Sequence, residues 1–199
     1  MKKLYLASAS PRRKELLALT GLDFEVRRLT EVDEDALLRD YEGDVIAQAE
    51  FLALKKAEIA LDLGLSGIFV TADTLVVSDD GAVLGKPQDV SEATMFLDRL
   101  AGNWHTVATG VALAERGDLV TQDRIESILE RTRVKFAPMT DKEIEDYISS
   151  GEPFDKAGGY GIQGRASKYI ERIDGCYFNV VGFPVHSFWE LWRRFNDLE

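Results

Sequence analysis

The stretch LYLASASPRRKELLALTG, residues 4–21, decides the fold class, because it joins a strand to a helix through a short turn. The apolar residues 4–7 are typical of a short buried strand. Ser10 followed by Pro11 predicts a helix N-terminus, since the serine side chain can accept a backbone N–H and proline lacks that donor. Gly21 marks the expected end of this helix. A strand that leads directly into a helix indicates an α/β protein.

Three positive charges, Arg12, Arg13 and Lys14, stand in the first turn of this predicted helix. The helix dipole is positive there, so each cation should cost about 0.3–1 kcal/mol. One interpretation is a phosphate site, because helix N–H groups and guanidinium forks both bind phosphate oxygens. The other is that the three cations pair weakly with surface carboxylates. The strand–turn–helix context favours phosphate, since α/β folds bind ligands at the carboxyl ends of their strands.

Strand-like and amphipathic helical runs alternate along the rest of the chain, which predicts an α/β fold throughout. With 199 residues, 45% of them hydrophobic, we expect a single domain over residues 1–199. Strands are expected at residues 3–7, 23–29, 67–77, 82–86, 104–114, 132–136 and 175–181, with a hairpin turn at 78–81. Helices are expected at residues 11–21, 44–64, 91–102, 140–151 and 184–195, and an acidic loop at 30–35.

Composition narrows the classes of partner. The formal net charge of −11 would repel nucleic-acid backbones and anionic membranes, so neither is expected to bind. A single cysteine excludes an internal disulfide, and two distant histidines provide no zinc spacing. The apolar run at the N-terminus is too short for a secretory signal, and no run is long enough to span a membrane. We therefore expect a cytoplasmic protein.

Asp73 stands inside the nearly apolar run IFVTADTLVV, residues 68–77. A carboxylate in such a strand costs several kcal/mol unless a cation or hydrogen-bond donors meet it, which points to a metal ion or a catalytic role. The alternative is a solvent-facing strand end. A second carboxylate could come from the acidic run, which contains Glu31, Asp33, Glu34 and Asp35. Such oxygen ligands favour Mg²⁺ or Mn²⁺.

The stretch SGEPFDKAGGYGIQG, residues 150–164, has five glycines in fifteen residues. Residues 159–164 fit the G-x-G-x-x-G pattern of dinucleotide-binding proteins, but a predicted helix rather than a strand precedes them. We interpret the loop as backbone that approaches a ligand closely, with Gln163 able to donate to and accept from a base edge. Ordinary turn chemistry is the alternative. Cys176 is expected to be a structural thiol in an apolar strand.

Several motifs together resemble a known family. They are LASASPRRKELL (6–17), TADTLVV (71–77), GKP (85–87), HTVATGVAL (105–113), SGEPFDKAGGYGIQG (150–164) and FNVVGFP (178–184). In order and spacing they resemble the Maf family of nucleoside triphosphate pyrophosphatases, from Leu4 to Pro184.

The resemblance implies a mixed, twisted sheet flanked by helices, like that of inosine triphosphate pyrophosphatases, with two lobes around a cleft and often a homodimer. It also implies hydrolysis of a nucleoside triphosphate to the monophosphate and pyrophosphate with a divalent metal cation, Mg²⁺ or Mn²⁺. DKAGGYGIQG, residues 155–164, is similar to the branch that prefers dTTP and UTP, and modified pyrimidine nucleotides are a further open class of substrate.

The family's catalytic aspartate corresponds to Asp73, which with Glu34 is also the expected metal contact. The family's specificity positions correspond to Arg12, Thr74 and Gln163. Its phosphate-side residues correspond to Arg13, Lys56 and Lys86, with Ser8 nearby.

Two other functions remain open. One is a nucleotide-sensing protein that acts in cell-division control without catalysis, which would bind UTP and release no pyrophosphate. The other is a nicotinamide-dependent oxidoreductase, which only residues 159–164 support and which would bind NADH.

Overall fold

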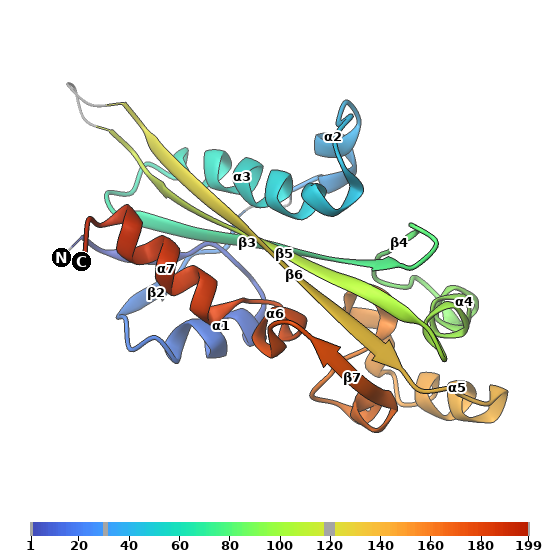
Figure 1. Cartoon of the computed structure of the whole chain (residues 1–199). Helices are drawn as coiled ribbons and strands as arrows, with labels where there is room; N and C mark the ends of the chain where they lie inside the picture. Colours follow the sequence, from blue (N-terminus) through green and yellow to red (C-terminus); the bar gives the residue numbers. More distant parts are fainter. Residues whose placement is uncertain (1, 30–31, 118–121, 199) are drawn as a thin grey trace. The chain divides into compact units, whose positions relative to one another are not determined.

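The computed structural model describes residues 2–29, 32–117 and 122–198 (Figure 1). The chain divides into two compact units. Unit 1 comprises Met1–Asp73, Thr109–Glu130 and Gly182–Glu199, and unit 2 comprises Thr74–Ala108 and Arg131–Val181. Among the described residues, no helix is long and apolar enough to cross a membrane.

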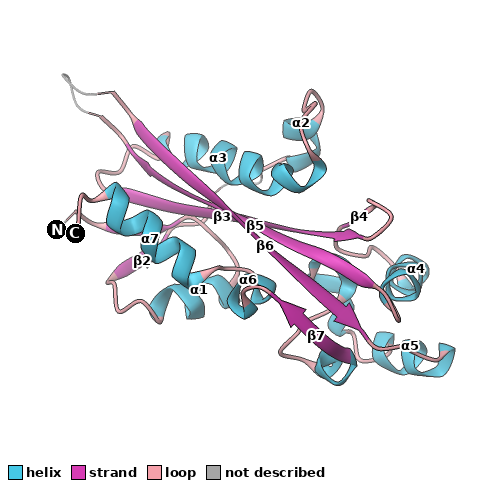
Figure 2. Cartoon of the chain, in the orientation of Figure 1, coloured by secondary structure: helices cyan, strands magenta, loops and turns pink. Residues whose placement is uncertain are grey.

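The strands form a mixed sheet, which confirms the predicted fold class (Figure 2). Its order is β2-β1-β3-β5-β6-β7, with β4 paired to β3. The strand β1 is parallel to β2 and β3, whereas β4 and β7 are antiparallel to their partners β3 and β6. The strands are β1 Leu4–Leu6, β2 Phe24–Val26, β3 Ile68–Ser78, β4 Val83–Leu84, β5 Trp104–Glu115, β6 Arg124–Phe136 and β7 Ile170–Asp174.

In unit 1, helix α3 lies on one face of the strands, and helices α1 and α7 lie on the other (Figure 1). Their bounds are α1 Pro11–Ala18, α3 Gln48–Leu61 and α7 Val185–Phe195, with a short 3-10 turn, η1 Val45–Ala47, before α3. In α7 the buried positions Phe188, Leu191, Trp192 and Phe195 recur at helical spacing, so one face of this helix packs on the unit's core.

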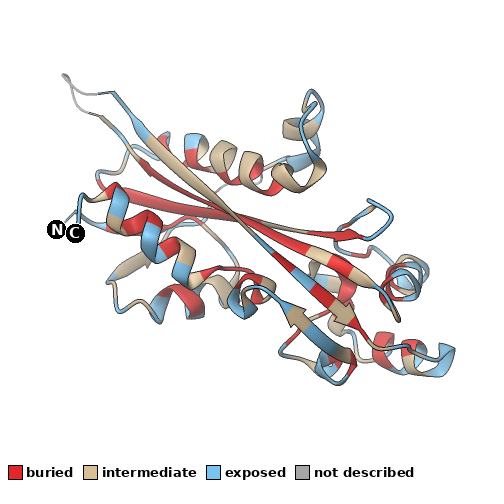
Figure 3. Cartoon of the chain, viewed as in Figure 1, coloured by how far each residue is buried: buried red, intermediate tan, exposed pale blue. Residues whose placement is uncertain are grey.

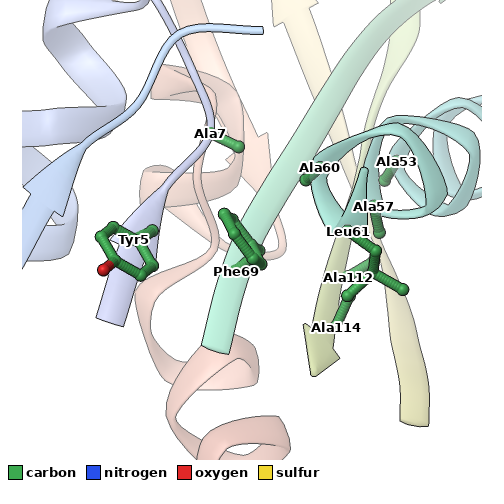
Figure 4. Close-up of a cluster of buried hydrophobic side chains, with 9 residues drawn as sticks. All are labelled: Tyr5, Ala7, Ala53, Ala57, Ala60, Leu61, Phe69, Ala112 and Ala114. Carbon is green, nitrogen blue, oxygen red and sulfur yellow. The ribbon is translucent and has the colours of Figure 1, made fainter. Parts of the chain in front are cut away.

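Small residues bring α3 close to the strands of unit 1 (Figure 4). Ala53, Ala57 and Ala60 are fully buried against the sheet. A Cβ at Gly110 of β5 would collide with the backbone of α3 at Ala49. The hydroxyl of buried Thr71 donates a 2.7 Å hydrogen bond to the Ala53 carbonyl, so α3 is also bonded to β3. These contacts fix the position of α3 beside β3.

Strand β3 is buried over most of its length (Figure 3). Its burial pattern therefore differs from the alternation of buried and exposed residues in a strand that has one solvent-exposed face. Asp73 is a buried residue in the middle of this strand rather than at a solvent-facing strand end.

Unit 2 contains β4, β7 and three helices, α4 Val90–Leu100, α5 Asp141–Ile148 and α6 Tyr177–Val181. Thr140 and Glu143 form a capping box at the start of α5, where the sequence predicts a helix to begin. The glycine-rich stretch contains two short 3-10 turns, η2 Glu152–Asp155 and η3 Ala157–Gly159, and a third turn, η4 Arg165–Tyr169, follows it.

Some expectations about local structure were wrong. The stretch 175–181 contains helix α6 instead of a strand, because the buried Asn179 amide donates 3.0 Å hydrogen bonds to the Val107 carbonyl and to the Thr132 hydroxyl. The expected acidic loop contains the start of helix α2, Glu34–Leu38, since Asp33 caps that helix by accepting from Ala36 N–H. Thr30 and Glu31 lie outside the described residues. Helix α4 begins at Val90, one residue before the expected start, and its N-cap is Asp89. Strand β7 was not predicted.

The buried His105 in unit 2 predicts a pH dependence of stability. Its Nε2 lies 2.7 Å from the Tyr160 hydroxyl oxygen, and burial lowers the pKa of His105 from 6.5 to about 3. Between these values the unfolded chain binds the extra proton, so stability is lost as the pH falls below about 6.5. From near pH 7 to near pH 5 this residue should contribute a loss of about 2 kcal/mol in the free energy of unfolding.

Urea unfolding of the wild type and of His105→Gln at both pH values measures this contribution. We expect the variant to lose about 2 kcal/mol less than the wild type between the two conditions. An equal loss in both proteins would contradict the assignment to His105.

Candidate active site

The N-terminus of α1 is built as the sequence predicts. Ser10 is the N-cap, and its hydroxyl accepts a 3.4 Å hydrogen bond from Arg13 N–H. The Ser8 hydroxyl accepts from Ser10 N–H at 3.2 Å, so the turn before the helix is also ordered by side chains. The helix ends at Ala18, and Gly21 follows with a positive φ of 73°. The first turn contains no acidic residue to offset the positive charges of Arg12, Arg13 and Lys14.

The Arg13 guanidinium is directed toward β3 of its own unit. Nη1 donates a 2.7 Å hydrogen bond to the Ala72 carbonyl, and Nε donates a 3.1 Å bond to the Gly182 carbonyl. Burial lowers the pKa of Arg13, and the carboxylates of Asp73 and Glu34 act in the opposite direction. Arg13 therefore places a positive charge beside Asp73 and holds the preceding carbonyl of β3 in place.

Lys56 joins the two acidic candidates. Its Nζ lies 2.5 Å from Asp73 Oδ1 and 2.6 Å from Glu34 Oε1. The side chains of Lys56 and Asp73 are only 12% and 9% exposed, whereas that of Glu34 is 49% exposed. The close approach of α3 to β3 allows this contact, because Lys56 is adjacent to the fully buried Ala57. Asp73 is thus paired with a cation inside unit 1.

The environment of Asp73 suits proton transfer. Desolvation by burial raises the pKa of Asp73, and the charges of Lys56 and Arg13 oppose this rise. A carboxylate with a raised pKa is a better proton acceptor, and the nearby cations hold it ionised. The arrangement can therefore accept a proton from a water molecule and can attract an anionic group.

The remaining candidates belong to unit 2. Thr74 follows Asp73 directly in β3 and is half-buried, and Lys86 and Gln163 are exposed. Gly158 N–H donates a 2.9 Å hydrogen bond to the Gly85 carbonyl, so the glycine-rich loop lies against the segment that carries Lys86. In this unit the structure brings the loop and the GKP motif together.

Close packing explains some of the glycines in this loop. At Gly158, φ is 71° and an added Cβ would lie 2.9 Å from Val76 Cγ1. A dinucleotide fingerprint joins a strand to a helix, whereas residues 159–164 run from the last residue of the 3-10 turn η3 to the residue before the 3-10 turn η4.

Unit 1 thus assembles Arg13, Glu34, Lys56 and Asp73, with Arg12 and Ser8 at the same end of α1. Sequence reasoning missed the Lys56 bridge between the two carboxylates, since α3 and β3 meet only in the folded chain. It also missed Glu152, whose carboxylate accepts Arg165 N–H at 2.9 Å within the glycine-rich region. The motif itself contains Glu152, but its glycines were interpreted as ligand-facing backbone or as ordinary turns, and the glutamate was not considered.

The site in unit 1 offers the carboxylates of Asp73 and Glu34 to a metal ion. Within residues 2–29, 32–117 and 122–198, no group of three or more His, Cys, Asp or Glu is arranged to hold one. Asp73 and Glu34 both contact Lys56 and provide two carboxylates. Mg²⁺ is typically held by one or two carboxylates together with substrate phosphates and water. The residues therefore fit a cation that arrives with a phosphate ligand.

Comparison with known proteins places the chain in a family. The model of the Maf-like protein family matches residues 3–195, and the chain belongs to this family. A protein of Symbiobacterium thermophilum named dTTP/UTP pyrophosphatase is 47% identical over 98% of this chain and 95% of its own length. A protein of the same name from Carboxydothermus hydrogenoformans is also 47% identical, over 98% and 99% of the two chains. A Bacillus cereus protein of that name is 41% identical over 98% and 91%.

The buried ion pair predicts a large and specific loss of stability in Lys56→Met. Removal of the lysine leaves the Asp73 carboxylate buried without its cation, which should cost about 3–5 kcal/mol in the free energy of unfolding near pH 7. Urea unfolding measures the cost. The double variant Lys56→Met with Asp73→Asn should recover part of it, because the uncompensated charge is gone.

Lys55→Met is the matched control, since Lys55 pairs on the surface with Glu58 and should lose less than about 1 kcal/mol. Similar losses in the Lys55 and Lys56 variants would show that the buried pair does not contribute in this way.

Proposed function

We propose that this protein is a nucleoside triphosphate pyrophosphatase that converts dTTP and UTP to the monophosphate and pyrophosphate. The buried Asp73 carboxylate, with the cations Lys56 and Arg13 beside it, is the observation that carries this proposal. The names of the relatives support the same activity. Modified pyrimidine nucleotides belong to the proposed range of substrates.

In the proposed reaction, Asp73 accepts a proton from the attacking water. The water oxygen forms a bond to the α-phosphorus, and the bond from that phosphorus to the bridging oxygen breaks. Pyrophosphate leaves with the electron pair, so negative charge builds on the leaving group. Positioned cations stabilise this charge more than they stabilise the bound substrate, which lowers the barrier.

Arg12, Arg13, Lys56 and Lys86 are the proposed sources of positive charge for the triphosphate, and Ser8 is a proposed phosphate contact. Lys56 and Arg13 also orient Asp73 through the contacts described above. The formal net charge of the protein is −11, so its overall electrostatic field repels anions. These cations must outweigh that repulsion locally for a triphosphate to bind.

We propose that a divalent cation, Mg²⁺ or Mn²⁺, accompanies the substrate and is held by Asp73 with Glu34. When bound, it supplies charge neutralisation on the phosphate oxygens. Glu34 is half-exposed and pairs with Lys56, so it is available to an ion only if that pair rearranges.

Thr74 and Gln163 of unit 2 are the proposed contacts to the base. A glutamine amide can donate and accept on the edge of a pyrimidine, and Gln163 is exposed in a loop turn. Thr74 directly follows Asp73 in β3. We also propose that the protein is a cytoplasmic homodimer and that it binds neither nucleic acid nor membranes.

The decisive experiment incubates the purified protein with Mg²⁺ and each common nucleoside triphosphate, with separate detection of pyrophosphate and inorganic phosphate. We expect pyrophosphate, preferentially from dTTP and UTP. Nucleotide binding without any pyrophosphate release would favour the sensor function, and inorganic phosphate as the first product would exclude the proposed bond cleavage.

Asp73→Asn should lower kcat for UTP at least about 10²-fold, because it removes the proton acceptor while keeping a side chain of similar size. Circular dichroism and urea unfolding check that the variant remains folded. Asp79→Asn is a matched control, since Asp79 is an exposed aspartate near the end of β3 whose pairing with Arg133 is superficial. Turnover by Asp73→Asn at the level of this control would remove Asp73 from the mechanism.

A further inference from the structure

The glycine-rich region of unit 2 contains a carboxylate that the proposed reaction does not use. Glu152 begins the 3-10 turn η2, directly after Gly151. Its backbone N–H donates to the Ser150 hydroxyl at 3.2 Å, and its carbonyl accepts from Lys156 Nζ at 2.8 Å. Hydrogen bonds therefore engage both the backbone N–H and the backbone carbonyl of Glu152, which fixes the position of its Cα and hence the base of its side chain.

The Glu152 side chain crosses to the far end of the loop. Oε2 accepts a 2.9 Å hydrogen bond from Arg165 N–H, and Oε1 accepts a 3.3 Å bond from the hydroxyl of Tyr147, a buried residue of α5. One carboxylate thus connects α5 to the residue that follows Gly164. Both of its oxygens have donors from within unit 2, which favours a positioning role over a direct contact with an anionic triphosphate.

The turn that this carboxylate contacts carries Gln163. Gly164 N–H donates to the Gly161 carbonyl at 2.9 Å, which closes a tight turn around Gln163. A Cβ on Gly164 would collide with the Glu152 carboxylate, and one on Gly161 would lie 2.7 Å from Lys156 Cε. The φ of Gly164 is −100°, a value open to any residue, so a side chain at this position would conflict with the observed position of the Glu152 carboxylate rather than with the backbone conformation.

From these contacts we propose that Glu152 is a positioning residue that fixes the Gly161–Gly164 turn and thereby sets the base preference exerted through Gln163. This inference rests on the proposed function, in which Gln163 reads the pyrimidine. A bonded carboxylate restricts the turn to one arrangement, so the glutamine amide meets the base without a further cost of ordering. The hydrogen-bonded turn should therefore affect discrimination between bases more than the chemical step.

The test measures kcat and KM for UTP and for CTP, which differ in the donor and acceptor pattern of the base. Glu152→Ala and Gln163→Ala should each lower the UTP-to-CTP ratio of kcat/KM by about tenfold, mainly through a higher KM for UTP. For Glu152→Ala this is the effect expected from losing one hydrogen bond to a charged group, and for Gln163→Ala it is the effect expected from losing a neutral hydrogen bond to the base. Glu152→Gln should keep the ratio within about threefold of the wild type, because its amide oxygen can still accept from Arg165 N–H.

Glu145→Ala is the matched control, since Glu145 is an exposed glutamate on α5 of the same unit and should leave both constants unchanged. If Glu152→Ala does not fold, Tyr147→Phe replaces it, because this change removes only the hydroxyl that donates to Glu152. It should lower the ratio by about threefold, as expected for a weaker neutral donor.

The outcomes separate the inference from the proposed function. A wild type that releases no pyrophosphate from UTP would overturn the function itself. An active wild type whose preference is lost in Gln163→Ala but retained in Glu152→Ala would overturn the role of Glu152 alone. Equal losses on UTP and CTP in Glu152→Ala, with the ratio unchanged, would also overturn it, since a purely structural role acts on both substrates alike. If Gln163→Ala leaves the ratio unchanged, the inference fails while the hydrolytic activity stands.

Discussion

The cost of placing a carboxylate in a buried strand constrains unit 1 more than any other feature. Asp73 lies among the apolar residues of β3 and needs compensating charge and donors. Lys56 from α3 supplies the direct contact, and Arg13 from α1 adds positive charge through a guanidinium bonded to the Ala72 carbonyl. The burial of Asp73 therefore requires α1 and α3 to lie in particular positions. The contacts that compensate for its burial are also the contacts on which the proposed catalytic mechanism depends.

The packing of α3 follows from this requirement. A lysine reaches a buried aspartate only if the helix backbone lies close to the sheet, and the alanines at 53, 57 and 60 allow that approach. The absence of a Cβ at Gly110 removes the remaining obstacle, since any side chain there would meet the Ala49 carbonyl. Small side chains on both surfaces thus act together with the ion pair, and substitution by larger residues should displace the catalytic candidates before it disrupts the core.

Local sequence signals predicted the parts of the structure that local interactions decide. Ser10, Pro11 and Thr140 gave helix starts where the structure has them, and the nearly apolar run around Asp73 indicated a buried strand. Helix α6 was missed because an apolar run of this length fits a strand equally well, and partners of Asn179 that are distant in sequence contribute to the helix. The hydrogen bonds of the Glu152 side chain were not predicted for a related reason, since its partner Arg165 lies at the other end of the loop.

The boundary between the two units crosses the chain several times, first between Asp73 and Thr74, and this limits how the chain can be divided. Unit 1 is made of three separate stretches of chain and unit 2 of two, and strands β3, β5 and β6 contribute to both. Neither unit corresponds to a contiguous gene fragment. Any single breakpoint in the chain therefore divides unit 1, and a breakpoint between residues 74 and 181 divides both units, so neither unit can be transferred intact as one fragment without residues of the other.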